Sequence, residues 1–371
     1  MIRKAVSGLL DKKSFLALFL TVALAFSCVG CSEDSSVDDN GEYETSTTQE
    51  ARSQEVESSP VTTPSSAVRG LSISVDNKTG LLNISRMTPE VVGEIGDSGV
   101  WTIFVYMCGT DLETNCGMGT GDIAEMCAAS DSDNVRFVVE TGGTYEWQNS
   151  AVESESIQRF VVQHGAIEAV DEQLRTSMGS ASTLSDFLLW GVENYASEHM
   201  GVVLWDHGGG SVTGICFDER ENYDSLSLAE LDEALCTYYG QRGRRFDFIG
   251  FDACLMGTVE TANILATYAD YMYGSEETEP GSGWDYTTIG DFLASNPDAD
   301  GLMLGKVVCD SFLAACKAQN DDNLTTLSVI DLGNIDTLLD AFNIFASGMY
   351  NVSSNTAVRA EIIRACLLYT S

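Results

Sequence analysis

Residues 202–210 have the sequence Val-Val-Leu-Trp-Asp-His-Gly-Gly-Gly, and residues 248–257 have the sequence Phe-Ile-Gly-Phe-Asp-Ala-Cys-Leu-Met-Gly. Each stretch is a continuous apolar run, typical of a strand that is covered on both faces. Each run stops at a reactive side chain, His207 in the first and Cys254 in the second. Reacting groups in open α/β sheets lie beyond the carboxyl ends of the strands, so the two stretches predict a site at one edge of such a sheet.

The sequence around these runs alternates between strand and helix patterns. Ser227 and Glu230 match a capping box at the start of one helix. Strands separated by helices indicate an α/β protein whose mostly parallel central sheet has helices on both faces. The expected strands are residues 100–107, 135–140, 156–163, 201–206, 246–251 and 271–274, and the expected helices are residues 111–129, 182–198, 227–239 and 255–268.

The chemistry of the two strand ends fits a cysteine nucleophile. The Gly-rich turn after His207 allows close approach of a ligand to the backbone. Cys254 is expected at the start of a helix, where the helix dipole favours a thiolate. The amides of Gly208 and Cys254 could bind an oxyanion. From the residues alone, a catalytic Cys–His pair and two packed structural side chains both remain open.

The sequences of these motifs resemble those of the clostripain family of cysteine peptidases. The resemblance rests on residues 202–210 and on Phe-Asp-Ala-Cys-Leu-Met at 251–256, and it extends to residues 106–113 and 279–286. It implies a caspase-like three-layer α/β/α sandwich and a thiol protease that cuts after Arg or Lys. By this resemblance Cys254 is the nucleophile, His207 is the general base and acid, and no third catalytic residue is required. Calcium is possible from the resemblance only, and no cofactor is needed for the chemistry.

Two aspartates beside the pair have different expected roles. Asp206 precedes His207 on an extended chain, so its side chain should point away from the imidazole. Asp252 lies two residues before Cys254 and should share its side, where it could bind a substrate Arg or Lys. The alternative for Asp252 is a turn or cap residue. A second carboxylate is expected from the acidic loop at 275–279, with Glu277 and Glu279 as candidates.

Activation by an internal cut is a further implication of the resemblance, because family members are often made as inactive precursors. The segment between the two catalytic positions contains Arg220, Arg242, Arg244 and Arg245. Arg220 is the preferred cleavage site, and the alternative is that all of these are ordinary surface charges.

The N-terminal residues predict a signal peptide followed by a flexible stalk. Residues 1–31 resemble a lipoprotein signal peptide with Cys31 as the lipidated residue, although Cys28 stands where the lipobox usually has Leu. Residues 32–98 predict an acidic, Ser/Thr-rich flexible stalk that ends in a short hairpin over 71–84. The peptidase domain is expected at 99–310. A helical part is expected at 311–371, where the sequence ends without a cap as if truncated.

Charge and missing motifs exclude several classes of protein. The chain has 56 acidic and 19 basic residues and a net charge of −37, which argues against nucleic-acid binding. An esterase of the Gly-x-Ser-x-Gly type and a His-Glu-x-x-His metallopeptidase are excluded because neither motif occurs. The sequence therefore predicts a monomeric, secreted or lipid-anchored cysteine endopeptidase. The alternative is a surface-anchored binding lipoprotein with an inactive peptidase scaffold.

Overall fold

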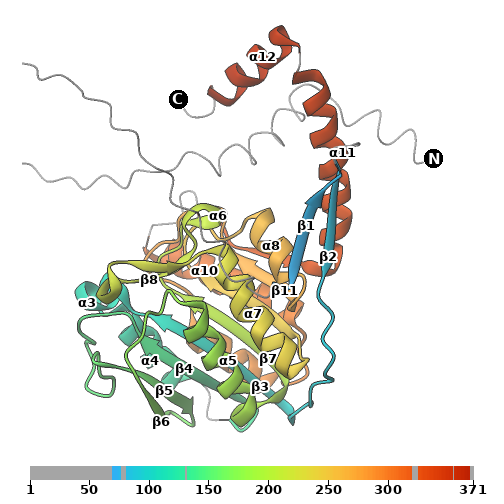
Figure 1. Cartoon of the computed structure of the whole chain (residues 1–371). Coiled ribbons are helices and arrows are strands. Elements are labelled where there is room, and N and C mark those ends of the chain that lie inside the picture. The colour runs from blue at the N-terminus through green and yellow to red at the C-terminus, as the bar shows by residue number, and fades with distance from the viewer. Residues whose placement is uncertain (1–68, 77–80, 130–131, 320–324, 354, 368–371) are drawn as a thin grey trace, which may run out of the picture. The chain divides into compact units, whose positions relative to one another are not determined.

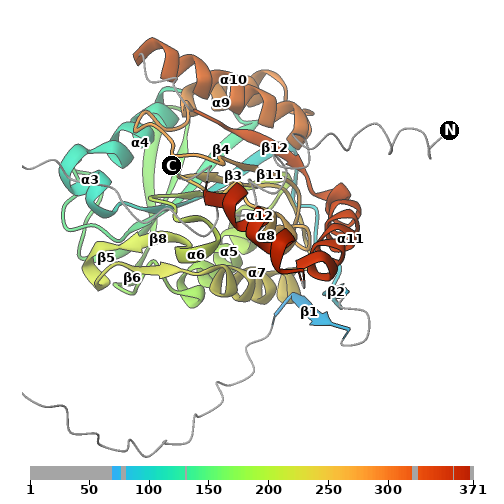
Figure 2. The ribbon, with the colours of Figure 1, turned by 90° about the horizontal axis from the view of Figure 1, so that it is seen from above.

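The computed structural model describes residues 69–76, 81–129, 132–319, 325–353 and 355–367. A central sheet lies between two layers of helices (Figures 1 and 2). The strands are β1 (Leu71–Val75), β2 (Leu82–Arg86), β3 (Asp97–Cys108), β4 (Val135–Gly142), β5 (Ser156–Gln163), β6 (Ala166–Leu174), β7 (Ser197–Trp205), β8 (Ile215–Asp218), β9 (Asp224–Leu226), β10 (Phe246–Asp252), β11 (Ala269–Gly274) and β12 (Ser328–Asp331). The helices are α3 (Thr110–Cys116), α4 (Met118–Ala128), α5 (Ala181–Tyr195), α6 (Gly210–Thr213), η3 (Glu219–Glu221), α7 (Leu228–Arg242), α8 (Val259–Leu265), α9 (Tyr286–Ser295), α10 (Gly301–Gln319), η4 (Leu332–Asn334), α11 (Ile335–Ser353) and α12 (Thr356–Leu367).

Within the described residues the central sheet has eight strands, in the order β12-β11-β10-β7-β3-β4-β5-β6. The five strands from β11 to β4 are parallel to one another, whereas β12, β5 and β6 each pair antiparallel with a neighbour. Parallel neighbours need crossover connections, which the helices provide. The predicted α/β fold with a mostly parallel sheet and helices on both faces is confirmed.

Each face of the sheet has its own hydrophobic core. On one face, Phe104 and Tyr106 of β3 pack with residues of α5, α7 and α8. On the other face, Ile103, Val105 and Met107 pack with residues of α4, α9 and α10. Successive side chains of a strand point to opposite faces, so the run at residues 103–108 of β3 is apolar at every position and contributes to both cores.

Several predicted helices have other bounds in the structure. The capping box of Ser227 and Glu230 is confirmed at the start of α7. The helix expected over 111–129 is divided into α3 and α4 by Gly117, which is left-handed with φ 65°. The helix expected over 182–198 ends at Tyr195, because the next residues begin β7. The helix expected over 255–268 is shorter than predicted, because α8 spans only Val259–Leu265.

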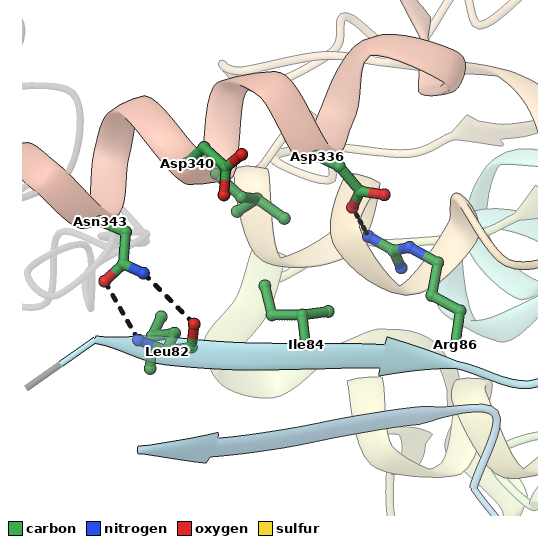
Figure 3. Close-up of a pocket in the computed structure, with 7 residues that line it drawn as sticks. Leu82, Ile84, Arg86, Asp336, Asp340 and Asn343 are labelled. Carbon is green, nitrogen blue, oxygen red and sulfur yellow. Dashed lines mark hydrogen bonds and ion pairs between the residues drawn. The ribbon is translucent and has the colours of Figure 1, made fainter. Parts of the chain in front are cut away.

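The predicted hairpin is present as the antiparallel pair of β1 and β2. The side-chain amide of Asn343 in α11 accepts from the Leu82 N–H (3.2 Å) and donates to the Leu82 carbonyl (3.3 Å), and Arg86 pairs with Asp336 (2.8 Å; Figure 3). A cavity of about 400 Å³ lies between β2 and α11, and its lining residues include Ile84 and Asp340. None of the residues that line it belongs to the predicted Cys–His site.

The C-terminal part is more than a set of helices. The boundary expected at residue 310 falls inside α10, and β12 beyond it joins the central sheet beside β11. The predicted signal peptide, Cys31 and most of the stalk lie outside the described residues. In the part of the chain that is described, no helix has both the length and the apolar character needed to span a bilayer.

Candidate active site

The carboxyl ends of β3, β7 and β10 lie side by side, because β7 pairs in parallel with both of the other strands. Trp205, the last residue of β7, is opposite Asp252, the last residue of β10. His207 and Cys254 each follow two residues later. The predicted adjacency of the two strand ends is therefore present in the structure.

Gly208 brings the two strand ends into direct backbone contact. A Cβ atom at this position would lie 2.0 Å from the carbonyl oxygen of Cys254, so a residue with a side chain does not fit without a shift of the backbone. The neighbouring Gly209 N–H donates to the Gly214 carbonyl (2.8 Å). Gly208 forms an isolated antiparallel bridge with Ile215, the residue that follows Gly214.

Cys254 does not lie at the start of a helix, and the sequence prediction on this point is wrong. Leu255 is left-handed with φ 64°, and the next helix starts only at Val259. The sulfur instead accepts a hydrogen bond from the Glu279 N–H (3.2 Å). Cys254 is half-buried, so solvent reaches this residue.

The imidazole of His207 contacts a carboxylate that the sequence analysis did not assign. Its Nε2 lies 2.9 Å from Oδ1 of Asp111, at the start of α3 just beyond β3. Asp206 is buried, and its Oδ2 accepts from the Phe217 N–H. The prediction that the Asp206 side chain points away from the imidazole is confirmed.

Three carboxylates lie together beside Cys254. Asp252 is buried and accepts from the Tyr286 hydroxyl (2.9 Å) and the Trp284 N–H (3.3 Å). Asp122 of α4 is also buried and accepts from Trp205 Nε1 (2.6 Å). A Cβ on Gly283 would lie 3.3 Å from Asp252 and 3.7 Å from Asp122, so oxygens of both carboxylates lie next to Gly283.

The third carboxylate is Glu279. Both of its side-chain oxygens are buried, and neither accepts a well-formed hydrogen bond from the described residues. Burial raises the pKa of Asp252 to about 7 and the pKa of Asp122 and Glu279 well above the usual range, and the charge of Asp252 raises both of the latter further. We refer to Asp122, Asp252 and Glu279 as the acidic cluster. The carboxylate oxygens of the acidic cluster are buried hydrogen-bond acceptors. Among the described residues, no basic side chain forms a hydrogen bond with them.

The two predicted candidates for the second carboxylate are in different places. Glu277 is exposed, and its backbone carbonyl accepts from the Leu255 N–H (3.0 Å), whereas Glu279 belongs to the acidic cluster. The sequence analysis missed Asp122. Its position in a helical stretch resembles that of an ordinary polar surface residue, and only the packing of α4 against the sheet places it beside Asp252.

The arginines proposed for an internal cut all make hydrogen bonds. Arg220 lies in η3, and its side chain is 13% exposed. It donates to the Ser154 carbonyl (2.6 Å), pairs with Glu155 (3.0 Å) and covers the ring of Tyr145. The other three pair with acidic side chains or backbone carbonyls around β10 and α5: Arg242, Arg244 and Arg245.

The described residues contain no group of three or more His, Cys, Asp or Glu side chains with a geometry suited to a metal ion.

Comparisons with known proteins agree with this arrangement. Clostripain from Hathewaya histolytica is 28% identical over 151 residues, which make up 35% of this chain and 28% of that protein. The chain thus matches less than a third of the length of this relative. A secreted C11 cysteine protease from Bacteroides thetaiotaomicron, "iotapain", has a similar fold, with a TM-score of 0.51 and 17% identity over 66% of this chain and 69% of that one. A structure from the same organism, of a secreted C11 cysteine protease with an irreversible peptide inhibitor, gives a TM-score of 0.51, 19% identity and coverages of 65% and 68%.

The family comparison includes both strand ends of the site. The sequence model of the clostripain family matches residues 105–366, from the middle of β3 to the end of α12. Because this match covers most of the chain together with His207 and Cys254, the chain belongs to the clostripain family.

Proposed function

We propose that the protein is a cysteine endopeptidase that cuts peptide bonds after Arg or Lys. Cys254 is the nucleophile and His207 the general base and acid. The observation that carries the proposal is the parallel pairing of β7 and β10, which brings Gly208 against the backbone of Cys254 beside the acidic cluster. Membership in the clostripain family supports the same reaction.

The reaction needs one covalent intermediate and four proton transfers, all through His207. His207 first takes the thiol proton of Cys254 as the sulfur bonds to the scissile carbonyl carbon, and the amides of Gly208 and Cys254 stabilise the oxyanion. The carbon–nitrogen bond breaks as His207 protonates the departing amine. Water then adds to the thioester and gives a proton to His207, which returns it to the sulfur as the acid product leaves.

The acidic cluster would bind the basic side chain before the cut. Its carboxylates are buried together, and an arriving guanidinium or ammonium group would compensate for their ionisation by charge-assisted hydrogen bonds. We assign Asp252 and Glu279 to this pocket, because the Glu279 N–H contacts the sulfur of Cys254 and the charge of Asp252 raises the pKa of Glu279. Glu277 is exposed and is therefore a weaker candidate for this pocket.

The test is cleavage of an Arg reporter peptide by the full chain, with and without a thiol alkylator. Cys254→Ala and His207→Ala should each lower kcat/KM by at least about 100-fold. Cys116→Ala removes an exposed thiol from α3 and should leave the rate unchanged. Retained cleavage in the Cys254 variant would refute the proposal.

Specificity has its own test. Citrulline has nearly the shape of arginine but no charge, so the parent should cleave the Arg reporter and not the citrulline reporter. Asp252→Ala should abolish cleavage after Arg. If the protein is folded but cuts neither Arg nor Lys peptides, the inactive-scaffold alternative, a surface-anchored binding protein, would be favoured.

We propose that a cut after Arg220 activates the protein. The supporting observation is the position of Arg220 in a short segment between His207 and Cys254, next to Asn222 and Tyr223, which are both left-handed. The side chain must leave its contacts with Ser154 and Glu155 before it can enter an acidic pocket. Processing of Cys254→Ala at the wild-type rate, when it is made alone, would exclude self-cleavage.

We propose further that the protein acts outside the cytoplasm as a monomer on protein or peptide substrates, anchored by lipid on Cys31. The motif Gly30-Cys31 supports this location, as does the fold shared with a protease that is described as secreted. Mass spectrometry of the mature protein would detect a lipidated Cys31, and an unmodified mature chain would contradict the anchor.

A further inference from the structure

Asp111 and His207 form a carboxylate–imidazole pair that the dyad chemistry does not use. Met107 near the end of β3 is opposite Trp205 at the end of β7, so the residues that follow these strands lie next to each other. Thr110 is left-handed with φ 42°, and the chain turns there into α3. This turn sets Oδ1 of Asp111 2.9 Å from Nε2 of His207.

The contact determines which ring nitrogen can transfer a proton. An ionised carboxylate only accepts hydrogen bonds, so Nε2 must carry the proton that lies between Asp111 and His207. The neutral ring then has its free lone pair on Nδ1. This nitrogen is left to take a proton from the thiol or from water and to give it to the departing amine.

We propose that Asp111 is a positioning residue of the site, which holds the proton on Nε2 of His207 and so makes Nδ1 the nitrogen that exchanges protons with sulfur and substrate. The inference rests on the proposed cysteine peptidase function. The same contact fixes the angle of the ring and stabilises the imidazolium that forms during each cycle.

A purely structural role would be expected to resemble that of Glu113, the other acid in the first turn of α3. Glu113 is buried, and its carboxylate accepts from the Thr120 N–H (2.8 Å), the Thr120 hydroxyl (2.6 Å) and the Gln148 N–H (2.6 Å). Asp111 is instead 40% exposed, and its carboxylate faces the imidazole and its own neighbour Thr110. Its principal partner is the imidazole.

Two other titratable groups interact electrostatically with Asp111 and must be constant in the test. They are Asp206, directly after β7, and Tyr223, in the segment after η3. Both are retained when only Asp111 is replaced.

The experiment compares Asp111→Asn with the parent in the full chain, using the Arg reporter peptide. Asparagine keeps the size of the side chain but removes its charge. We expect kcat to fall roughly 10- to 100-fold with KM changed less than about twofold. The loss should fall on kcat, because an amide does not hold the proton on Nε2 as a carboxylate does. Asp111→Glu restores a carboxylate and should recover part of the lost kcat.

The matched control is Asp133→Asn, which removes the carboxylate from another exposed pair, with Nε2 of His164 (3.2 Å). It should leave kcat and KM unchanged. The inference is overturned if Asp111→Asn keeps the parent's kcat, or if its loss of kcat is accompanied by an equal rise of KM and a matching loss of thermal stability. Should Asp111→Asn fail to fold, Asp111→Glu is judged by the same split between kcat and KM.

The proposed peptidase function and the role of Asp111 can be refuted separately. Full activity of His207→Ala would refute the proposed function and the inference together. An inactive His207→Ala beside a fully active Asp111→Asn would refute only the inference.

Discussion

The buried carboxyl of Asp252 should make the protein less stable as the pH rises. Burial raises its pKa from the ordinary 3.8 to about 7, so between these values the folded protein holds a proton that the unfolded chain has released. Folding stability is then highest below about pH 4 for this group and is lost as the pH rises to about 7. A shift of about three pH units corresponds to about 4 kcal/mol, of which roughly 2–3 kcal/mol is lost between pH 5 and pH 8.

Asp252→Asn removes this pH-dependent contribution to the free energy of unfolding, because asparagine is neutral at every pH. Its side chain can still accept a hydrogen bond from the Tyr286 hydroxyl. The free energy of unfolding would be measured by urea denaturation at pH 5 and pH 8, in a Cys254→Ala background that prevents self-cleavage. The background protein should lose about 2 kcal/mol more over this range than the Asp252→Asn variant. Asp298→Asn, at an exposed position, is the control and should behave like the background. Equal losses with and without Asp252 would show that its carboxyl is not held protonated in the fold.

Two further substitutions test the core and the backbone contact. Arg159 is buried and pairs with the buried Glu140 (2.7 Å), so Arg159→Met should cost about 3–5 kcal/mol of stability by thermal or urea unfolding, and a second change to Glu140→Gln should recover part of it. A cost below about 1 kcal/mol would mean that Glu140 is not left as an uncompensated charge. Gly208→Ala places a Cβ against the carbonyl of Cys254 and should reduce kcat at least about tenfold, whereas Gly121→Ala in α4, where nothing lies within 4 Å, should retain activity and gain up to about 1 kcal/mol. Normal turnover of the Gly208 variant would disprove the close approach.

The middle of the sheet could be predicted from the sequence because β3, β7 and β10 contain long apolar runs. Phe104 and Val105 pack into opposite cores, and side chains that are buried on both faces produce the continuous runs typical of central strands. The edge strand β12 gives no such signal, since its four residues are at most partly covered. Its place beside β11 is fixed by antiparallel pairing with residues that precede it by more than 50 positions.

The candidate site could be predicted as far as its strand ends and no further. His207, Cys254 and Asp252 follow apolar runs, so the rule on carboxyl strand ends applies to them directly. The same rule applied to β3 would have found Asp111, which follows that strand at the same edge. The turn at Leu255 could not be predicted, because the carbonyl of Glu277 and the amide of Glu279 hold that segment in place from a distant loop.

The contact between Leu82 and Asn343 has a consequence for synthesis. The outer edge of β2 is covered by a side chain that follows it by 261 residues. At about 5–20 residues per second, a growing chain waits about 13–50 s before that side chain exists. During this interval the Leu82 amide and carbonyl can bond to any passing extended segment, which is the general hazard of open strand edges. Covering this edge is therefore among the last steps in the maturation of the chain, and export machinery or a chaperone that keeps the early part extended would prevent premature association.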